Sequence, residues 1–158
     1  MNVLFMCTAN SCRSILSEAL FNHLAPQGFQ AISSGSFPKG QVLPRSLTTL
    51  KAAGISTEGL YSKGNDAFEG SPPDFVITVC DKAAGEVCPF WPGQPVTAHW
   101  GFLDPAAVEG SEDEKRAVFA QTLRQIRRRV ELFLSLPIET LDRMAIEKKI
   151  RAIGQEPL

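Results

Sequence analysis

Short apolar runs alternate with amphipathic stretches along this chain. A short apolar run lies at 3–6, and the mostly apolar segments 29–33, 75–79 and 96–100 also have the length and composition of strands. Apolar residues at helical spacing predict helices after the first strand, from Pro44 to about Gly54, and over 111–136. Strands that alternate with helices form parallel sheets with both faces covered. We therefore expect an α/β fold, with a four-stranded parallel sheet and helices on both faces.

Residues that favour helix ends support these boundaries. Ser14 can serve as the N-cap of the first helix, and Pro44 starts the second, with Gly54 as its stop. Ser111 can cap the long helix, and the acidic residues 112–114 suit its positive end. The buried stripe of this helix is expected to consist of Val118, Leu123, Ile126, Val130 and Phe133.

The chain after Pro137 forms a tail with its own apolar pattern. Helical spacing in the tail predicts one more helix, which contains Leu141, Met144, Ile146, Ile150 and Ile153. We therefore divide the chain into a catalytic domain, 1–136, and a C-terminal helical extension, 137–158. The sequence assigns no role to this extension.

Composition narrows the class of protein. The chain has 158 residues, 44% of them apolar, and a formal net charge of −1. These values fit one globular domain and give no reason to expect nucleic acid or an anionic membrane as a partner. No run reaches transmembrane length and no signal-type stretch precedes the first strand, so we expect a cytoplasmic protein. We expect a monomer, although the sequence does not determine the oligomeric state. The arginine cluster 127–129 is expected to form a solvated face near the negative end of the long helix.

The segment between the first strand and the first helix has the features of an oxyanion site. Cys7 follows the strand, and the small and polar residues after it are Thr8, Ala9, Asn10, Ser11, Cys12 and Arg13. Backbone N–H groups of such a loop converge on one point, the helix dipole adds positive charge there, and the Arg13 guanidinium can hold two oxygens of a tetrahedral anion. The same field favours a thiolate. We therefore expect Cys7 to have a lowered pKa and to be the nucleophile, with the Ser14 hydroxyl donating to its sulfur.

Two more cysteines are predicted at the same edge of the sheet. Cys80 directly follows the third strand, and Cys88 comes eight residues later, in a segment rich in Gly and Pro. In a reducing compartment such cysteines indicate chemistry or metal binding more than structural disulfides. A thiolate that has attacked an oxidised centre can be released by a second thiol, and that thiol by a third. Cys12, inside the loop, is interpreted as a packing residue, and a protective role or an alternative disulfide stays open for it.

The motif CTANSCRS at 7–14 resembles the phosphate loop of the low-molecular-weight protein tyrosine phosphatases and of the arsenate reductases that share their fold. The resemblance extends over about 2–136 and implies a Rossmann-like sheet. In such sheets the site lies at the carboxyl ends of the strands, where Cys7, Cys80 and Asp104 are expected to meet. No cofactor is expected.

The string VITVCDKAAGEVCP at 76–89 resembles the redox segment of the thioredoxin-coupled arsenate reductases. The resemblance implies that Cys7 attacks arsenate, that Cys80 displaces arsenite by forming a disulfide with Cys7, and that Cys88 then takes over this disulfide. Thioredoxin, or glutaredoxin with glutathione, would regenerate the thiols. The donor stays open, because the segment between Cys80 and Cys88 is one residue longer than in the best-known members. Phosphate and sulfate are expected to compete with arsenate.

The segment HWGFLDPA at 99–106 carries a second signature of these families. Its Asp104 can protonate the leaving oxygen. The tyrosine phosphatases usually have aromatic residues just after this Asp–Pro pair, whereas this chain has Ala106 and Ala107. The segment therefore favours the reductases.

One departure from the resembling reductases concerns potassium. Some of them bind the ion through residues that match Asn10, Glu18 and Ser33, with an acidic residue where this chain has Lys63. A Lys63 ammonium can replace the ion, so we expect no potassium requirement, while Asn10 shapes the loop by hydrogen bonds. Neither histidine has metal-ligand spacing with the cysteines, so both are expected to be structural and no metal is expected.

Three functions stay open on the sequence. The leading hypothesis is an arsenate reductase. The alternative enzyme is a low-molecular-weight protein tyrosine phosphatase, acting on phosphotyrosine or a small phosphoester, in which Cys80 and Cys88 are incidental or regulatory. A third hypothesis is a non-catalytic protein that binds arsenite or a soft metal through its thiols, which leaves Arg13 and Asp104 unexplained.

Overall fold

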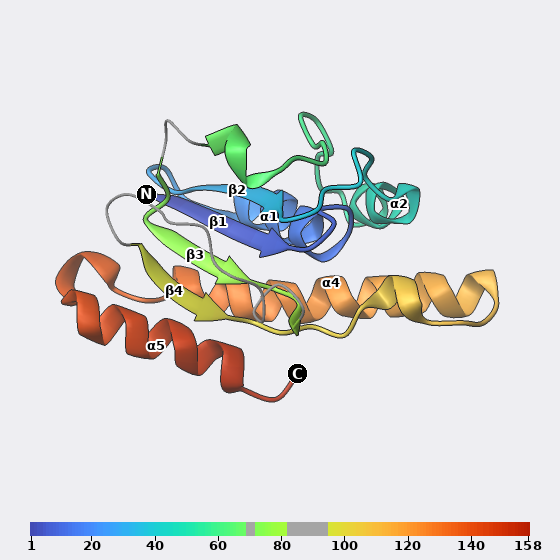
Figure 1. Ribbon diagram of the computed structural model, residues 1–158. Coiled ribbons are helices and arrows are strands. Elements are labelled where there is room, and N and C mark those ends of the chain that lie inside the picture. Colours follow the sequence, from blue (N-terminus) through green and yellow to red (C-terminus); the bar gives the residue numbers. More distant parts are fainter. Residues whose placement is uncertain (69–71, 82–94) are drawn as a thin grey trace.

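The computed structural model describes residues 1–68, 72–81 and 95–158. At its centre lies a four-stranded sheet (Figure 1) of β1 (Asn2–Cys7), β2 (Gln30–Gly35), β3 (Phe75–Thr78) and β4 (Val96–His99). The spatial order is β2-β1-β3-β4, and every neighbouring pair is parallel. The carboxyl ends of the strands therefore lie at one edge, and the predicted parallel sheet is confirmed, with strand ends shifted by one or two residues.

The described part of the chain contains α-helices and short 3₁₀ turns besides the sheet. The α-helices are α1 (Arg13–Leu24), α2 (Pro44–Ala52), α4 (Glu112–Leu134) and α5 (Arg143–Gln155). Short 3₁₀ turns are η1 (Asn65–Phe68), η2 (Pro105–Ala107) and η3 (Ile138–Thr140). α1 and α4 pack against each other and against one face of the sheet (Figure 1).

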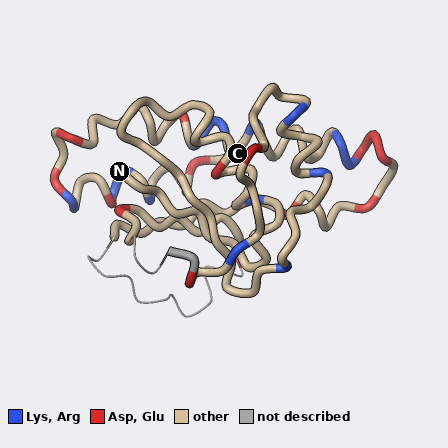
Figure 2. The backbone as a smooth tube through the Cα atoms, turned by 90° about the horizontal axis from the view of Figure 1, so that it is seen from above, with Lys and Arg blue, Asp and Glu red and all other residues tan. Residues whose placement is uncertain are grey.

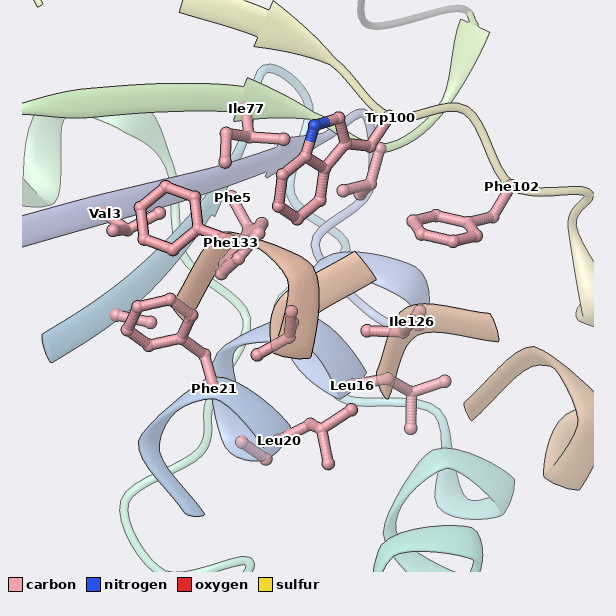
Figure 3. Packing of buried hydrophobic residues seen from close by; sticks show 14 of the residues in the cluster. Val3, Phe5, Leu16, Leu20, Phe21, Ile77, Trp100, Phe102, Ile126 and Phe133 are labelled. Carbon is pink, nitrogen blue, oxygen red and sulfur yellow. The ribbon is translucent and has the colours of Figure 1, made fainter. Parts of the chain in front are cut away.

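The main hydrophobic core lies between the sheet and these two helices (Figure 3). Phe133 of α4 is central to it, because its ring contacts the rings of Phe21, Phe29, Phe75 and Trp100 with centroid distances between 5.3 and 6.5 Å. All four contacts are edge-to-face, a geometry that adds attraction to the burial of apolar area. One helix residue thus joins α1, the sheet and the end of β4.

The start of α1 differs from the prediction. Arg13 is its first residue and Cys12 occupies the N-cap, where no side chain makes a capping hydrogen bond. Ser14 is buried in the first turn, and its hydroxyl accepts a hydrogen bond from Asn10 Nδ2 at 2.8 Å. Ser14 is therefore part of the loop's support and is not the cap.

α4 begins as predicted, because Ser111 Oγ accepts a hydrogen bond from the Glu114 backbone N–H at 3.1 Å. Of the stripe predicted to be buried, Val118 is half-buried and the others are buried. The predicted solvated face over 127–129 is wrong for Arg129, which is 4% exposed, while its two neighbours are exposed. Successive helix residues are about 100° apart, so Arg129 points away from Arg127 by about 200° and lies on the face of α4 that packs on the core.

The predicted tail helix is confirmed as α5, which lies beside β4 (Figure 1). Its buried residues are Ile146, Ile150 and Ile153. They belong to the main core, and the Trp100 indole N–H donates to the Ile150 carbonyl at 2.9 Å. Two residues differ from the prediction: Met144 is 84% exposed and lies outside the buried face, and Leu141 precedes α5, at the end of η3. The division of the chain at residue 136 stays a prediction.

A polar contact also joins α5 to the sheet. Arg151 Nε donates to the Thr97 carbonyl of β4 at 3.1 Å, and Arg151 Nη2 lies 3.3 Å from the Thr97 hydroxyl. β4 is the last strand in the sheet order, so this carbonyl belongs to an edge strand. α5 therefore provides both apolar cover and a hydrogen-bond donor for this edge.

Charged residues of both signs are interspersed over the described part of the chain (Figure 2). This distribution agrees with a formal net charge of −1. Within the described ranges, no helix combines the length and the apolar character that crossing a membrane requires.

Replacing Phe133 by Ala is expected to lower the free energy of unfolding by about 3–5 kcal/mol, because a buried ring is lost and a cavity opens among four others. Urea denaturation followed by tryptophan fluorescence measures this change. Phe37→Ala is the matched control, since Phe37 is 71% exposed. An equal loss in both variants would contradict the central place of Phe133 in the core.

Candidate active site

The loop between β1 and α1 is held from outside by its carbonyl groups. Backbone N–H groups of the segment after β2 donate to them over 2.9–3.1 Å, in the pairs Phe37 to Thr8, Lys39 to Ala9 and Leu43 to Ser11. Since these carbonyls are engaged on the outer side, the N–H groups of the loop are expected to face its interior. A concave row of N–H groups at a helix N-terminus is an anion site.

Asn10 fixes the turn of this loop. Its φ is 47°, in the left-handed region that asparagine tolerates better than most residues. The buried side chain donates from Nδ2 to Ser14 Oγ at 2.8 Å and to Ser33 Oγ at 3.0 Å, and Oδ1 accepts from the Lys63 backbone N–H at 2.8 Å. The prediction that Asn10 shapes the loop by hydrogen bonds is confirmed.

Gly35 is a requirement of the loop that the sequence analysis missed. It ends β2 directly beside the loop, and a Cβ atom at this position would lie 2.5 Å from Thr8 O and 2.9 Å from Asn10 N. Any side chain here would push the loop away from the strand. The available signal was a glycine two residues after the predicted end of the second strand, at the edge where the site was expected.

Cys7 and Cys80 lie together at the ends of the neighbouring strands β1 and β3. Both are buried, with 6% and 2% of their surfaces exposed, and their side chains are hydrogen-bonded to each other. Cys80 Sγ is 3.7 Å from the Thr8 hydroxyl, and both cysteines are in the thiol form. The predicted proximity of Cys80 to the anion loop is confirmed.

The predicted lowering of the Cys7 pKa is wrong for this arrangement. The hydrogen bond with Cys80 and the burial of the sulfur raise the pKa of the Cys7 thiol well above its ordinary value. Arg13 and the backbone N–H of Thr8 act in the opposite direction. Two adjacent thiols titrate as a pair, because a second negative charge beside the first is disfavoured. The pair is therefore expected to hold no more than one negative charge at neutral pH.

Arg13 connects the loop to the segment that carries Asp104. Arg13 Nη1 donates to the Phe102 carbonyl at 2.8 Å, and Nη2 lies 3.8 Å from Asp104 Oδ2. The other Asp104 oxygen accepts from the Ala106 N–H at 3.0 Å, and 42% of the Asp104 side chain is exposed. An accessible carboxyl group thus faces the guanidinium at the mouth of the loop.

The other two cysteines of the chain, besides the pair Cys7 and Cys80, are Cys12 and Cys88. Cys12 is buried, and this burial raises the pKa of its thiol to about 11, so it is neutral at pH 7. A neutral buried thiol agrees with the predicted packing role. Cys88 lies outside the described residues.

Lys63 forms a buried ion pair close to the loop. Its Nζ is 3.1 Å from Glu18 Oε1 and 3.2 Å from Ser33 Oγ, and it also donates to the Tyr61 carbonyl at 3.1 Å. The Ser33 hydroxyl donates to the same Glu18 oxygen at 2.7 Å. The Lys63 ammonium therefore contacts Glu18 and Ser33, two of the residues that match potassium ligands in the resembling reductases.

His99 lies in a polar network at the ends of β3 and β4. Its Nδ1 is 2.8 Å from Thr78 Oγ1, and its Nε2 is 2.8 Å from Asp81 Oδ1. These contacts agree with a structural role. Within the ranges that the structure covers, no cluster of three or more His, Cys, Asp and Glu side chains is arranged to hold a metal ion.

This sheet, with a cysteine-to-arginine loop at its carboxyl edge and an aspartate facing the arginine, is the arrangement of one phosphatase class. Residues 2–149 match the low molecular weight phosphotyrosine protein phosphatase family, and the chain belongs to this family.

Within the family, similar proteins include arsenate reductases. That of Halalkalibacterium halodurans is 35% identical over 131 residues, which cover 83% of this chain and 93% of the relative. The crystal structure of the Archaeoglobus fulgidus arsenate reductase is 27% identical, with a TM-score of 0.64, over 82% of this chain and 98% of that one. The thioredoxin-dependent arsenate reductase of Corynebacterium glutamicum is also 27% identical, with a TM-score of 0.57, over 83% of this chain and 62% of that one.

Lys63→Gln is expected to lower the free energy of unfolding by about 3–5 kcal/mol, because it leaves the Glu18 carboxylate buried without its partner. Thermal or urea denaturation measures the loss, and Lys39→Gln, on an exposed lysine, is the matched control. Replacing choline chloride in the buffer by potassium chloride, at equal ionic strength, should leave the free energy of unfolding of the parent protein unchanged. The same replacement should raise the free energy of unfolding of Lys63→Gln. A parent protein that gains stability specifically from potassium would contradict replacement of the ion by Lys63.

Proposed function

We propose that this chain is an arsenate reductase that converts arsenate to arsenite with its own thiols. The observation that supports this function most is the hydrogen-bonded pair Cys7 and Cys80 beside an oxyanion loop. Hydrolysis of a phosphoester needs one nucleophilic thiol, whereas a reduction of arsenic needs a second thiol to accept the oxidation. The similarity to arsenate reductases points to the same activity.

In the proposed first step, the single negative charge of the thiol pair lies on Cys7, and the Cys7 thiolate attacks the arsenic atom. An As–S bond forms, the As–O bond to one arsenate hydroxyl group breaks, and that hydroxyl leaves as water after it takes a proton from Asp104. The loop N–H groups and the Arg13 fork hold the remaining oxygens. The contact of 3.8 Å between Arg13 and Asp104 supports a carboxyl group near that oxygen.

In the second step, the Cys80 thiolate attacks the Cys7 sulfur. The disulfide forms as the As–S bond breaks, and the electron pair of that bond stays on arsenic, which leaves as arsenite. Cys88 then attacks the Cys80 sulfur and releases the Cys7 thiolate, so that the oxidation ends as a disulfide between Cys80 and Cys88. The role of Cys88 in this step is inferred from the sequence alone.

An external thiol donor must return two electrons to this disulfide. We favour thioredoxin, because the similar protein of Corynebacterium glutamicum is thioredoxin-dependent. Glutaredoxin with glutathione is the alternative donor. We propose that the enzyme is a monomer and works in the cytoplasm, where such donors are kept reduced. Phosphate and sulfate are the anions expected to compete with arsenate.

Reduced protein mixed with arsenate, without any external reductant, is expected to release one arsenite per chain and to acquire a Cys80–Cys88 disulfide. Arsenite quantification and mass-spectrometric disulfide mapping measure both products. Cys80→Ser should release no arsenite yet keep hydrolysis of p-nitrophenyl phosphate, because its loop and Cys7 are intact. Cys7→Ser should lose both activities.

The opposite pattern would favour the phosphatase. In that case arsenate oxidises no cysteine of the parent protein and no arsenite is released, while the parent and the double variant Cys80→Ser, Cys88→Ser hydrolyse phosphoesters equally fast. Stoichiometric binding of arsenite without consumption of arsenate would instead indicate a metalloid-binding protein. A second assay, with thioredoxin or with glutaredoxin and glutathione, identifies the donor by multiple turnover.

A further inference from the structure

Arg129 connects the C-terminal end of the chain to the segment after β4. The residue is 4% exposed, and its guanidinium donates from Nη1 to the Gly101 carbonyl at 3.0 Å. Nη2 lies 3.2 Å from the Gly154 carbonyl and 3.2 Å from the Glu156 carbonyl. The guanidinium carbon stands 4.7 Å from the centroid of the Phe102 ring. Three carbonyl groups and one ring thus hold this cation.

The opposite side of the same segment faces the anion loop. The Phe102 carbonyl accepts from Arg13 Nη1 at 2.8 Å, and its N–H donates to the Val79 carbonyl at 3.2 Å. Two residues later comes Asp104, whose carboxyl group lies 3.8 Å from Arg13. The segment 101–104 is therefore held between Arg13 on the loop side and Arg129 on the C-terminal side.

The C-terminal residues are closely fitted to this place. At Gly154, any Cβ atom would collide with the His99 carbonyl oxygen and would lie 2.8 Å from the Trp100 ring. Glu156 is exposed, yet its backbone carbonyl reaches Arg129 and its carboxylate lies 3.8 Å from Arg128. The end of the chain thus adds acceptors to Arg129 without burying the side chains of 156–158.

Arg129 is a costly group to bury for stability alone. Burial lowers the pKa of its guanidinium, which measures the penalty on the charged form. Its Nε has no hydrogen-bond partner among the described residues. Replacing a buried charge by a well-packed apolar residue is often neutral or stabilising. A role in fixing the geometry of its neighbours accounts for this arginine better than a contribution to stability.

We propose that Arg129 and the C-terminal residues Gly154 and Glu156 form a positioning clamp for the active site, holding the segment 101–104 so that Asp104 and Arg13 keep their mutual geometry. This role rests on the proposed function. The anion itself is held by the loop, which the clamp does not touch, so the clamp acts on the step in which Asp104 gives its proton. Loss of the clamp therefore lowers kcat for arsenate reduction more than it raises KM.

Deletion of 156–158 is the mildest test, because it removes one acceptor of Arg129 and no buried side chain. It is expected to lower kcat about 3- to 10-fold, and Arg129→Met about 10- to 100-fold, since misplacement by about 1 Å can cost a factor of 100. Arg129→Lys should recover part of the Arg129→Met loss, because it restores a donor. Arg127→Met is the matched control, since Arg127 is exposed and pairs with Glu131 on the same helix.

Two readouts separate positioning from general stability. In an Asp104→Asn background, the deletion should change kcat by less than about twofold, because the group on which the clamp acts is already gone. Hydrogen exchange of the amides in 101–104 should be faster in the deletion variant than in the parent, and unchanged in Arg127→Met. Thermal melting shows that each variant is folded at the assay temperature.

The clamp is overturned if the deletion and Arg129→Met variants keep the parent exchange rates in 101–104. It is also overturned if the loss in kcat is the same with and without Asp104→Asn. A parent protein that produces no arsenite refutes the proposed reductase and leaves the exchange experiment as a separate test of the clamp. In that case p-nitrophenyl phosphate hydrolysis, which also needs a proton at the leaving oxygen, takes the place of arsenate in the kcat comparison.

Discussion

In an anion loop, a row of backbone N–H groups must point to one place. The carbonyl groups of the same peptide units then point outward, and they need hydrogen-bond partners on that outer side. Here the carbonyls of Thr8, Ala9 and Ser11 are bound by N–H groups of the segment after β2. The left-handed backbone of Asn10 and the missing side chain of Gly35 let the loop pass close to that strand. The loop is thus defined by its outer partners as much as by its own residues. Buried backbone groups need such partners, and the loop satisfies this need on the side away from the anion.

Local signals were sufficient for most of the fold. Four apolar runs predicted the strands, and Pro44 and Ser111 predicted helix starts, because each signal acts within a few residues of its own position. The start of α1 was mispredicted, since Ser14 satisfies Asn10 instead of the helix end. The loop was recognisable because its residues are contiguous.

The features that the sequence did not predict depend on residues far apart in the chain. The proximity of Cys80 to the loop was predicted, but the raised pKa of Cys7 depends on a direct contact between the two side chains and on the burial of the sulfur, which only the packed structure shows. Arg129 looked like one member of a charged surface, because its acceptors at Gly154 and Glu156 lie a whole helix away. A pattern of charge along a helix shows which residues are polar. It does not state whether another part of the chain will supply carbonyl groups to a polar residue that faces inward.

The position of α5 has a consequence for assembly. An edge strand offers unpaired backbone groups to any other extended chain, and sheets can grow by adding a strand there. In this protein the Thr97 carbonyl of β4 is already taken by Arg151, and the His99 carbonyl lies against Gly154. A second molecule that approached with a strand would meet a helix in place of open hydrogen-bonding groups. The extra helix thus protects the sheet from intermolecular strand addition on the β4 side.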